Sequence, residues 1–207
     1  MSEALERIAK VLRDGSDELS LMNLGLTSVP EEIGLLKQVT VLSLDMNRLA
    51  SLPAAIGQMT ALDEFSASEN LLESLPREIG HLKNLRILYL AQNRLTSLPA
   101  EIGQLARLTY LQVEDNMLTS LPAEIGELSN LSTLKLARNR LIVLPPEMGR
   151  LTKIRSPRFP PSQRHIVDPR IQLTIYDNPL IDPPPEIRRT DEVMAYLRAK
   201  LNDRSSQ

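Results

Sequence analysis

The chain contains no cysteine and no tryptophan, and only 3% of its residues are aromatic. Without cysteine, it can form neither disulfide bonds nor Cys-ligated zinc sites. The scarcity of aromatic side chains argues against a base-stacking module, and a formal net charge of −2 is unlike that of a strongly basic nucleic-acid binder. We therefore expect a protein that binds no nucleic acid.

Long hydrophobic runs are also missing. No apolar stretch approaches the roughly 20 residues that a transmembrane helix needs. Residues 1–16 lack the apolar segment of a secretory signal peptide. These absences predict a cytoplasmic protein without a membrane span.

The sequence lacks the common catalytic motifs as well. It has no Walker A motif, no GxGxxG, no HExxH and no cysteine nucleophile. The two histidines, His81 and His165, lie far apart in the chain. The sequence therefore predicts a protein that is not an enzyme and that holds no cofactor or metal ion.

What the sequence does contain is a period of 23 residues. The nine residues LTSLPAEIG occur at 95–103 and again at 118–126. The same spacing relates a set of asparagines, a set of prolines and a set of glycines, of which the asparagines are Asn47, Asn70, Asn93, Asn116 and Asn139. A fixed period indicates a repeat architecture, in which each turn of the chain packs against the next.

Each repeat reads LxxLxLxxNxLxxLPxxIGxL. The LxL core alternates inward and outward and predicts a short strand, and successive strands should stack in parallel. The asparagine after the strand can bond to backbone groups at the bend, so a column of asparagines should form a ladder. On the opposite side, the proline limits the chain to extended or short helical turns, and the glycine is expected to give a bend.

This pattern resembles the leucine-rich repeat family, in the 23-residue class with LPxxIGxL, over about residues 18–186. The resemblance implies an α/β solenoid, a curved right-handed superhelix with a parallel sheet on its concave side and a capping helix at each end. The ending NPLIDPPPEI…YL resembles the last repeat of intracellular Ras-group proteins and of Roco-type repeat domains. That likeness implies a Ras-like GTPase or another signalling protein as partner.

We expect a single domain over 1–207, whose parts are an N-terminal capping helix in 1–17, six repeats in 18–151, an insertion at 152–170, a last repeat at 171–188, and a C-terminal capping helix and tail in 189–207. Leu5, Ile8, Ala9 and Leu12 fall on one helical face, which we expect to cover the first edge of the core. The insertion is where the 23-residue spacing is lost.

Residues between the strand leucines should face outward on the concave side. Tyr89 and Tyr110 fall on neighbouring strands beside Ile87, Gln112 and Lys135, and this group is the strongest candidate for a binding hot spot. Aromatic and β-branched residues also suit a strand surface without binding anything. The remaining candidates for partner contact are Glu64, Glu114, Asp115, Arg138 and Tyr176.

Charges on this face are expected to tilt it negative and to steer a basic partner patch, although they could equally be ordinary solubilising charges. The acidic positions are Asp45, Glu64, Glu69, Glu114 and Asp115, with Lys135 and Arg138 opposing them. The insertion is a second candidate surface, for an acidic partner or a phosphate, or else it packs against the last turns. Its candidate residues are Arg155, Arg158, Arg164 and His165.

The sequence thus predicts a non-catalytic protein–protein interaction module or scaffold that binds a protein on its concave face, and the resemblance of the last repeat implies small-GTPase signalling as its setting. Three alternatives stay open: a bacterial effector or host-interaction repeat protein, a structural spacer, and an enzyme with its site in the insertion. The sequence does not indicate an oligomeric state.

Overall fold

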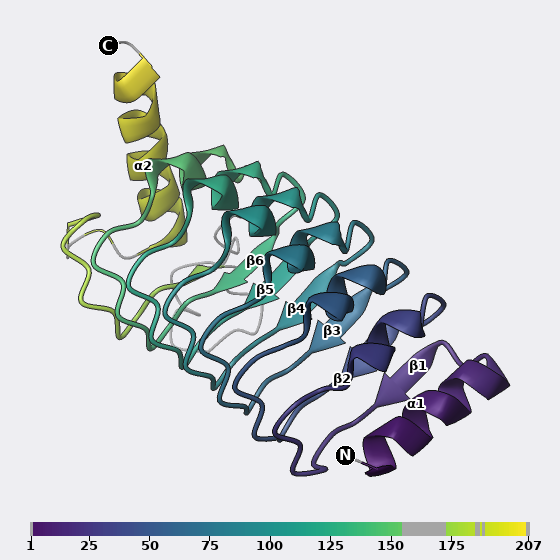
Figure 1. Ribbon diagram of the computed structural model, residues 1–207. Coiled ribbons are helices and arrows are strands. Elements are labelled where there is room, and N and C mark those ends of the chain that lie inside the picture. The colour runs from purple at the N-terminus through teal and green to yellow at the C-terminus, as the bar shows by residue number, and fades with distance from the viewer. Residues whose placement is uncertain (1, 155–172, 185–186, 188, 206–207) are drawn as a thin grey trace, which may run out of the picture.

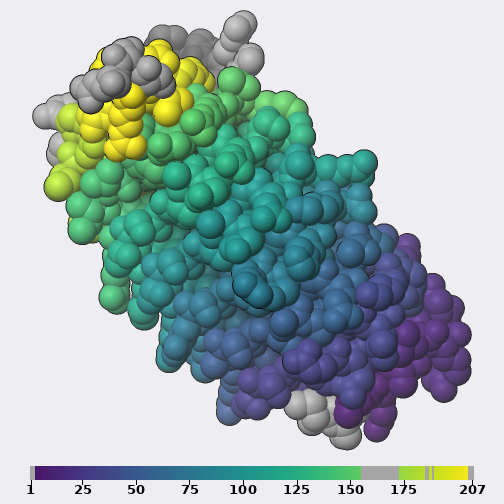
Figure 2. Space-filling view, turned by 45° about the horizontal axis from the view of Figure 1, so that its top comes forward, coloured from purple at the N-terminus to yellow at the C-terminus, as the bar shows by residue number. Residues whose placement is uncertain are grey.

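A computed structural model describes residues 2–154, 173–184, 187 and 189–205 of the chain (Figure 1). Its strands form one seven-stranded parallel sheet in the order of the sequence. The strands are β1 (Glu18–Ser20), β2 (Val41–Ser43), β3 (Glu64–Ser66), β4 (Ile87–Tyr89), β5 (Tyr110–Gln112), β6 (Thr133–Lys135) and β7 (Leu173–Thr174). The predicted solenoid with a parallel sheet is confirmed, and Figure 2 shows its turns stacked along one axis from purple to yellow.

The register of the sheet follows the repeat. From β1 to β6 each residue pairs with the residue one period later, as Leu88 does with Leu111. The pairing continues beyond the interruption of the period, because Leu134 on β6 pairs with Leu173 on β7. The sheet therefore joins residues on both sides of the insertion in one continuous surface.

Short 3-10 helices line the opposite side of each turn (Figure 1). Those in the described residues are η1 (Glu31–Leu35), η2 (Ala54–Gln58), η3 (Arg77–His81), η4 (Ala100–Gln104), η5 (Ala123–Glu127) and η6 (Pro146–Arg150). Each follows a proline in extended conformation, such as Pro99 with φ −67° and ψ 149°. Proline fixes φ near this value, so the repeated proline sets where each helix begins.

Leucine and isoleucine side chains from every turn fill the space between the sheet and the 3-10 helices. Leu88, Leu90, Leu95 and Ile102 of one turn are all fully buried. Phe65 takes the central strand position on β3 and is fully buried as well. No single turn could shield these side chains from water, so the core is stable only when the turns stack.

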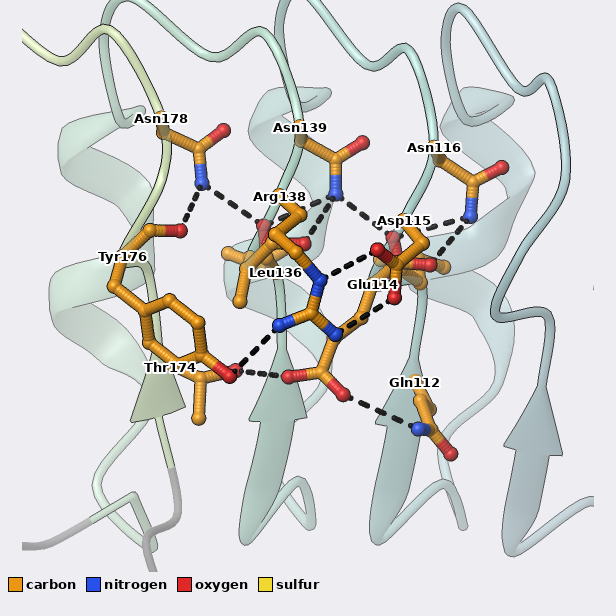
Figure 3. Close-up of polar contacts among 12 residues, drawn as sticks. Gln112, Glu114, Asp115, Asn116, Leu136, Arg138, Asn139, Thr174, Tyr176 and Asn178 are labelled. Atoms are coloured by element: carbon orange, nitrogen blue, oxygen red, sulfur yellow. Dashed lines mark hydrogen bonds and ion pairs between the residues drawn. The ribbon is translucent and has the colours of Figure 1, made fainter.

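The predicted asparagine ladder is present. Asn93 Nδ2 donates hydrogen bonds to the carbonyl oxygens of Ala67 and Leu90, at 2.9 and 3.2 Å, and its Oδ1 accepts one from the Leu72 amide at 3.0 Å. Asn178 makes the same contacts to Leu136, Ile175 and Leu141 in the last turn. Figure 3 shows the one to Leu136. Each asparagine thus satisfies buried backbone groups of its own turn and of the turn before it.

Glycines recur every 23 residues on the convex side, and the sequence suggested that they provide a bend. The structure gives a different reason for them. Gly103 does not adopt a positive φ, so conformational freedom is not what the position requires. A Cβ atom there would lie 2.5 Å from the carbonyl oxygen of Glu124 in the next turn. Gly57, Gly80 and Gly126 are crowded by the following turn in the same way. Glycine lets adjacent 3-10 helices approach closely, and the expectation of a glycine bend was wrong.

A helix, α1 (Ser2–Asp14), packs against β1 and η1 at the first end of the sheet (Figure 1). Its buried residues are Ala4, Ile8 and Val11, so the predicted face of Leu5, Ile8, Ala9 and Leu12 was wrong except for Ile8. Leu5 and Leu12 are 38% and 43% exposed. Two apolar stripes overlap on this helix, and the one with Ala4, Ile8 and Val11 faces the core. Arg7 donates to the Ser20 carbonyl oxygen at 2.9 Å.

A second helix, α2 (Thr190–Ser205), packs against η6 at the other end. Val193, Met194 and Leu197 are buried in this contact. Arg198 Nε donates to the carbonyl oxygen of Gly149 at 3.1 Å. Among the described residues, no helix is long and apolar enough to cross a membrane.

Candidate protein-binding surface

The concave face is the face of the sheet turned away from the 3-10 helices. The first and third residues of each strand lie on it, on either side of a buried residue, as Ile87 and Tyr89 flank Leu88. Tyr110 and Gln112 flank Leu111 in the same way on β5. The sequence therefore placed these candidate residues on the correct face, and their side chains are half-buried there rather than fully exposed.

Two tyrosines meet at the middle of this face. Tyr110 lies opposite Ile87 in the β4–β5 register, and the Tyr89 and Tyr110 ring centroids are 5.3 Å apart with the planes tilted by 55°. Burial raises the pKa of both hydroxyls; the charge of Glu64 raises the pKa of Tyr89 further, while Tyr89 and Glu114 add to the effect at Tyr110. Both hydroxyls are therefore neutral at physiological pH and can donate hydrogen bonds to a partner.

Glu114 forms a bridge over the strand next to it. Its Oε1 accepts a hydrogen bond from Thr174 Oγ1 at 2.8 Å, and its Oε2 accepts one from Gln112 Nε2 at 3.2 Å (Figure 3). The position on the intervening turn that matches Glu114 is Ala137, whose short side chain is buried. Burial lowers the pKa of Lys135, and the charge of Glu114 partly opposes that effect. The hydrogen bonds from Gln112 and Thr174 thus hold the Glu114 carboxylate in position.

Asp115, Arg138 and Tyr176 form a second cluster (Figure 3). Arg138 binds both carboxylate oxygens of Asp115, at 2.5 and 2.7 Å, and its Nη1 donates to the Tyr176 hydroxyl at 3.0 Å. The guanidinium carbon lies 5.6 Å from the centroid of the Tyr176 ring. Hydrogen bonds from Arg138 lower the pKa of Asp115, and those to Asp115 and Tyr176 raise the pKa of Arg138. These charges neutralise each other within the chain.

A group of serines surrounds Asp45, one of the acidic residues predicted on this face. Asp45 accepts hydrogen bonds from Ser43 Oγ at 2.9 Å, from Ser66 Oγ at 2.5 Å and from the Ser68 amide at 2.6 Å. Ser43 and Ser66 lie one period apart in the sequence and pair with each other in the β2–β3 register. The serine groups are neutral and leave the charge of Asp45 in place, so it still adds to the negative tilt of the face, whereas the charge of Asp115 is offset by Arg138.

The candidate residues of the insertion cannot be compared with the structure. Arg155, Arg158, Arg164 and His165 lie outside the described residues. His81 lies at the end of η3 and is exposed on the convex side. In the part of the chain that the structure describes, no three His, Asp or Glu side chains come close enough together to hold a metal ion.

Comparison with known proteins agrees with this geometry. A family model of a leucine-rich repeat region matches residues 65–156. The chain is a leucine-rich repeat protein. Its structure is similar to that of the leucine-rich repeat protein LIC12759 of Leptospira interrogans, with 36% sequence identity and a TM-score of 0.66. That match covers 75% of this chain and 36% of the Leptospira chain. A search of curated proteins finds no match.

Two further structures are similar to this leucine-rich repeat protein. The plant peptide hormone receptor RGFR1, solved in complex with RGF2, is 34% identical with a TM-score of 0.56, over 61% of this chain and 21% of the receptor. An internalin, InlF, from Listeria monocytogenes shares the fold, with 20% identity and a TM-score of 0.60 over 74% of this chain and 39% of that one. The chain spans well under half the length of each of these three proteins.

Proposed function

We propose that this leucine-rich repeat protein is a non-catalytic interaction module that binds a protein partner on its concave face. The observation that carries the proposal is the contact between Tyr89 and Tyr110, half-buried on neighbouring strands at the middle of that face. Tyrosine is enriched at binding hot spots because its ring buries a large apolar area while its hydroxyl can hydrogen-bond. The plant receptor of similar fold, solved in complex with RGF2, gives the proposal further support.

The rigidity of the face supports the same proposal. The asparagine ladder, the Glu114–Thr174 bridge and the Asp115–Arg138 pair fix the strands and side chains around the tyrosines before any partner arrives. A surface that is already ordered loses little conformational entropy on binding, so more of its contact energy appears as affinity.

The experiment is affinity capture of partners from a cytosolic extract of the source organism, followed by reconstitution with the purified partner. The test variant is Tyr89→Ala with Tyr110→Ala, and the matched control is His81→Ala with Gln104→Ala on the convex side. We expect the tyrosine variant to lose a partner that the control retains, with affinity for the purified partner weakened roughly thirtyfold or more. If the wild type, the tyrosine variant and the control all capture the same proteins, the concave face is not the binding site. That result would favour the structural-spacer alternative.

The partner class is a narrower proposal, which rests on the resemblance of the last repeat to Ras-group and Roco-type proteins. It names a Ras-like GTPase or another signalling protein, met in the cytoplasm. Purified Ras-like GTPases, loaded with GDP or with a GTP analogue, should bind the wild-type chain and not the tyrosine variant. If none of them binds while another partner does, the GTPase class is excluded and the interaction module stands.

The bacterial alternative has support of its own in the similarity to the Leptospira interrogans protein. It proposes that the partner is a protein of a host cell. Capture from an extract of host cells, run beside capture from the chain's own cytosol, separates the two proposals. A partner found in the host extract alone, and lost with the tyrosine variant, would support the bacterial alternative.

A further inference from the structure

At two places in the structure a basic side chain contacts both a tyrosine ring and a carboxylate. Arg138 lies 5.6 Å from the Tyr176 ring centroid and binds the Asp115 carboxylate. Lys200 Nζ lies 5.3 Å from the Tyr196 ring centroid and binds the Asp182 carboxylate. A ring face attracts a cation electrostatically, and the carboxylate adds a charge-assisted hydrogen bond.

A third set of such groups lies at the middle of the concave face. In the parallel register Ile87 has Glu64 on one side and Tyr110 on the other, and Tyr89 follows two residues later on the same strand. Neighbouring strands are about 4.8 Å apart, so the Glu64 carboxylate and both rings lie around the same apolar side chain. We call Glu64, Ile87, Tyr89 and Tyr110 the Ile87 platform; all four are half-buried.

The Ile87 platform differs from the other two sets in having no cation. Among the residues that the structure describes, the Glu64 carboxylate makes no ion pair or hydrogen bond, and the Tyr89 and Tyr110 hydroxyls have no hydrogen-bond partner. The basic side chain next to it in sequence, Arg86, is engaged by the Asp63 carboxylate just outside the strands. The platform therefore presents an unneutralised carboxylate and two aromatic rings to solvent.

We propose that the Ile87 platform binds an arginine or lysine side chain of the protein partner. The cationic group lies between the Glu64 carboxylate and the faces of Tyr89 and Tyr110, and the methylene groups of the same side chain pack on Ile87. Arginine and lysine suit this surface because they combine an apolar stem with a charged end. This inference rests on the proposed function and names the chemistry of the partner residue at that site.

The geometry also explains why the partner supplies the charge. A cation built into this surface would close the platform in the way that Arg138 closes the Tyr176 cluster. The raised pKa of Tyr89 agrees with a carboxylate close to its hydroxyl, because the charge of Glu64 contributes to it after burial.

The test uses short capped peptides of the form Gly-X-Gly, in which X is arginine, lysine, norleucine or glutamate. They are titrated at millimolar concentration into the isotope-labelled chain, and the ring resonances of Tyr89 and Tyr110 are followed by NMR. We expect the arginine and lysine peptides to shift both sets of resonances, with a weaker effect at high salt. Glu64→Gln should weaken this binding about tenfold, whereas Glu18→Gln, the matched change on β1, should leave it unchanged.

Several results would overturn the inference. They are equal shifts from the norleucine and arginine peptides, unaltered binding by Glu64→Gln, or no shift of either tyrosine with any peptide. Thermal unfolding of Glu64→Gln confirms that the variant is folded. Capture of the protein partner separates this failure from failure of the proposed function. If Glu64→Gln retains the partner with full affinity and the Tyr89→Ala, Tyr110→Ala variant loses it, the concave binding site stands and the cation inference is wrong.

Discussion

Glu114 and Thr174 are joined by a 2.8 Å hydrogen bond, although they are 60 residues apart and the strand β6 lies between their turns. The bond links the turn that contains β7 to the turn that contains β5. The matching position of the intervening turn holds Ala137, whose small side chain is buried. Stacking in this protein is therefore not limited to contacts between neighbouring turns, which are the main contacts in repeat proteins.

Thr174→Val should destabilise the chain by about 1.5 kcal/mol, because it keeps the side-chain volume and removes the donor to a charged carboxylate. The measurement is the free energy of unfolding from urea titration. Thr133→Val, on the concave face of β6, is the control and should change stability by less than about 0.5 kcal/mol. Equal effects of the two variants would show that the Glu114–Thr174 bond contributes nothing to stability.

Asn93→Ala should cost about 3 kcal/mol, because the Leu72 amide and the carbonyl oxygens of Ala67 and Leu90 each lose a buried hydrogen bond. Asn84→Ala is the matched control, since Asn84 is exposed and bonds to the Thr60 carbonyl oxygen at the surface. Urea unfolding of both variants measures the difference. A loss at Asn93 no greater than that at Asn84 would contradict the role of the ladder.

Gly103→Ala should destabilise the protein by about 1–3 kcal/mol through overpacking, since the added methyl group would meet the Glu124 carbonyl oxygen at 2.5 Å. Ser97→Ala, at an exposed position of the same turn, should be nearly neutral. Calorimetric melting of the two variants provides the comparison. An unchanged Tm for Gly103→Ala would show that the 3-10 helices can move apart at no cost.

Arg138→Gln should raise the pKa of Asp115 toward its usual range, because Arg138 holds it below that range. A carboxyl whose pKa is lower in the folded than in the unfolded chain stabilises the fold above its unfolded pKa, and this stabilisation is lost as the pH falls through the folded pKa. The variant should therefore lose stability at neutral pH, and the loss should shrink as the pH falls below about 4. NMR titration of the Asp115 carboxyl and urea unfolding at each pH measure both effects.

Arg94→Gln is the control for that titration, because Arg94 forms no ion pair among the described residues. It should leave the pKa of Asp115 and the pH dependence of stability unchanged. An Asp115 pKa that stays the same in Arg138→Gln would contradict the assignment of the shift to this ion pair.

The sequence alone was sufficient to predict the strand register and the asparagine ladder, because both follow from the 23-residue period. The spacing of Asn93 and Asn116 predicted both the parallel register and the ladder, because a fixed interval forces equivalent atoms to repeat along the stack. It also placed Tyr89 and Tyr110 on the same face, and their contact follows from neighbouring strands in that register.

Features that break the period, or depend on how two surfaces fit, could not be predicted. The Glu114–Thr174 bond requires the register of β7, which the insertion hides from the sequence. The buried face of α1 was misassigned because two apolar stripes compete, and only the fit against β1 decides between them. The role of Gly103 was misassigned because the crowding comes from Glu124 in another turn.

The central claim is that the partner docks on the concave face around the tyrosine pair. Site-specific photocrosslinking tests it most directly, with benzoylphenylalanine placed at Tyr89 in one variant and at His81, on the convex side, in another. The account predicts that the purified partner is crosslinked from position 89 and not from position 81. Crosslinking from position 81 alone would contradict it.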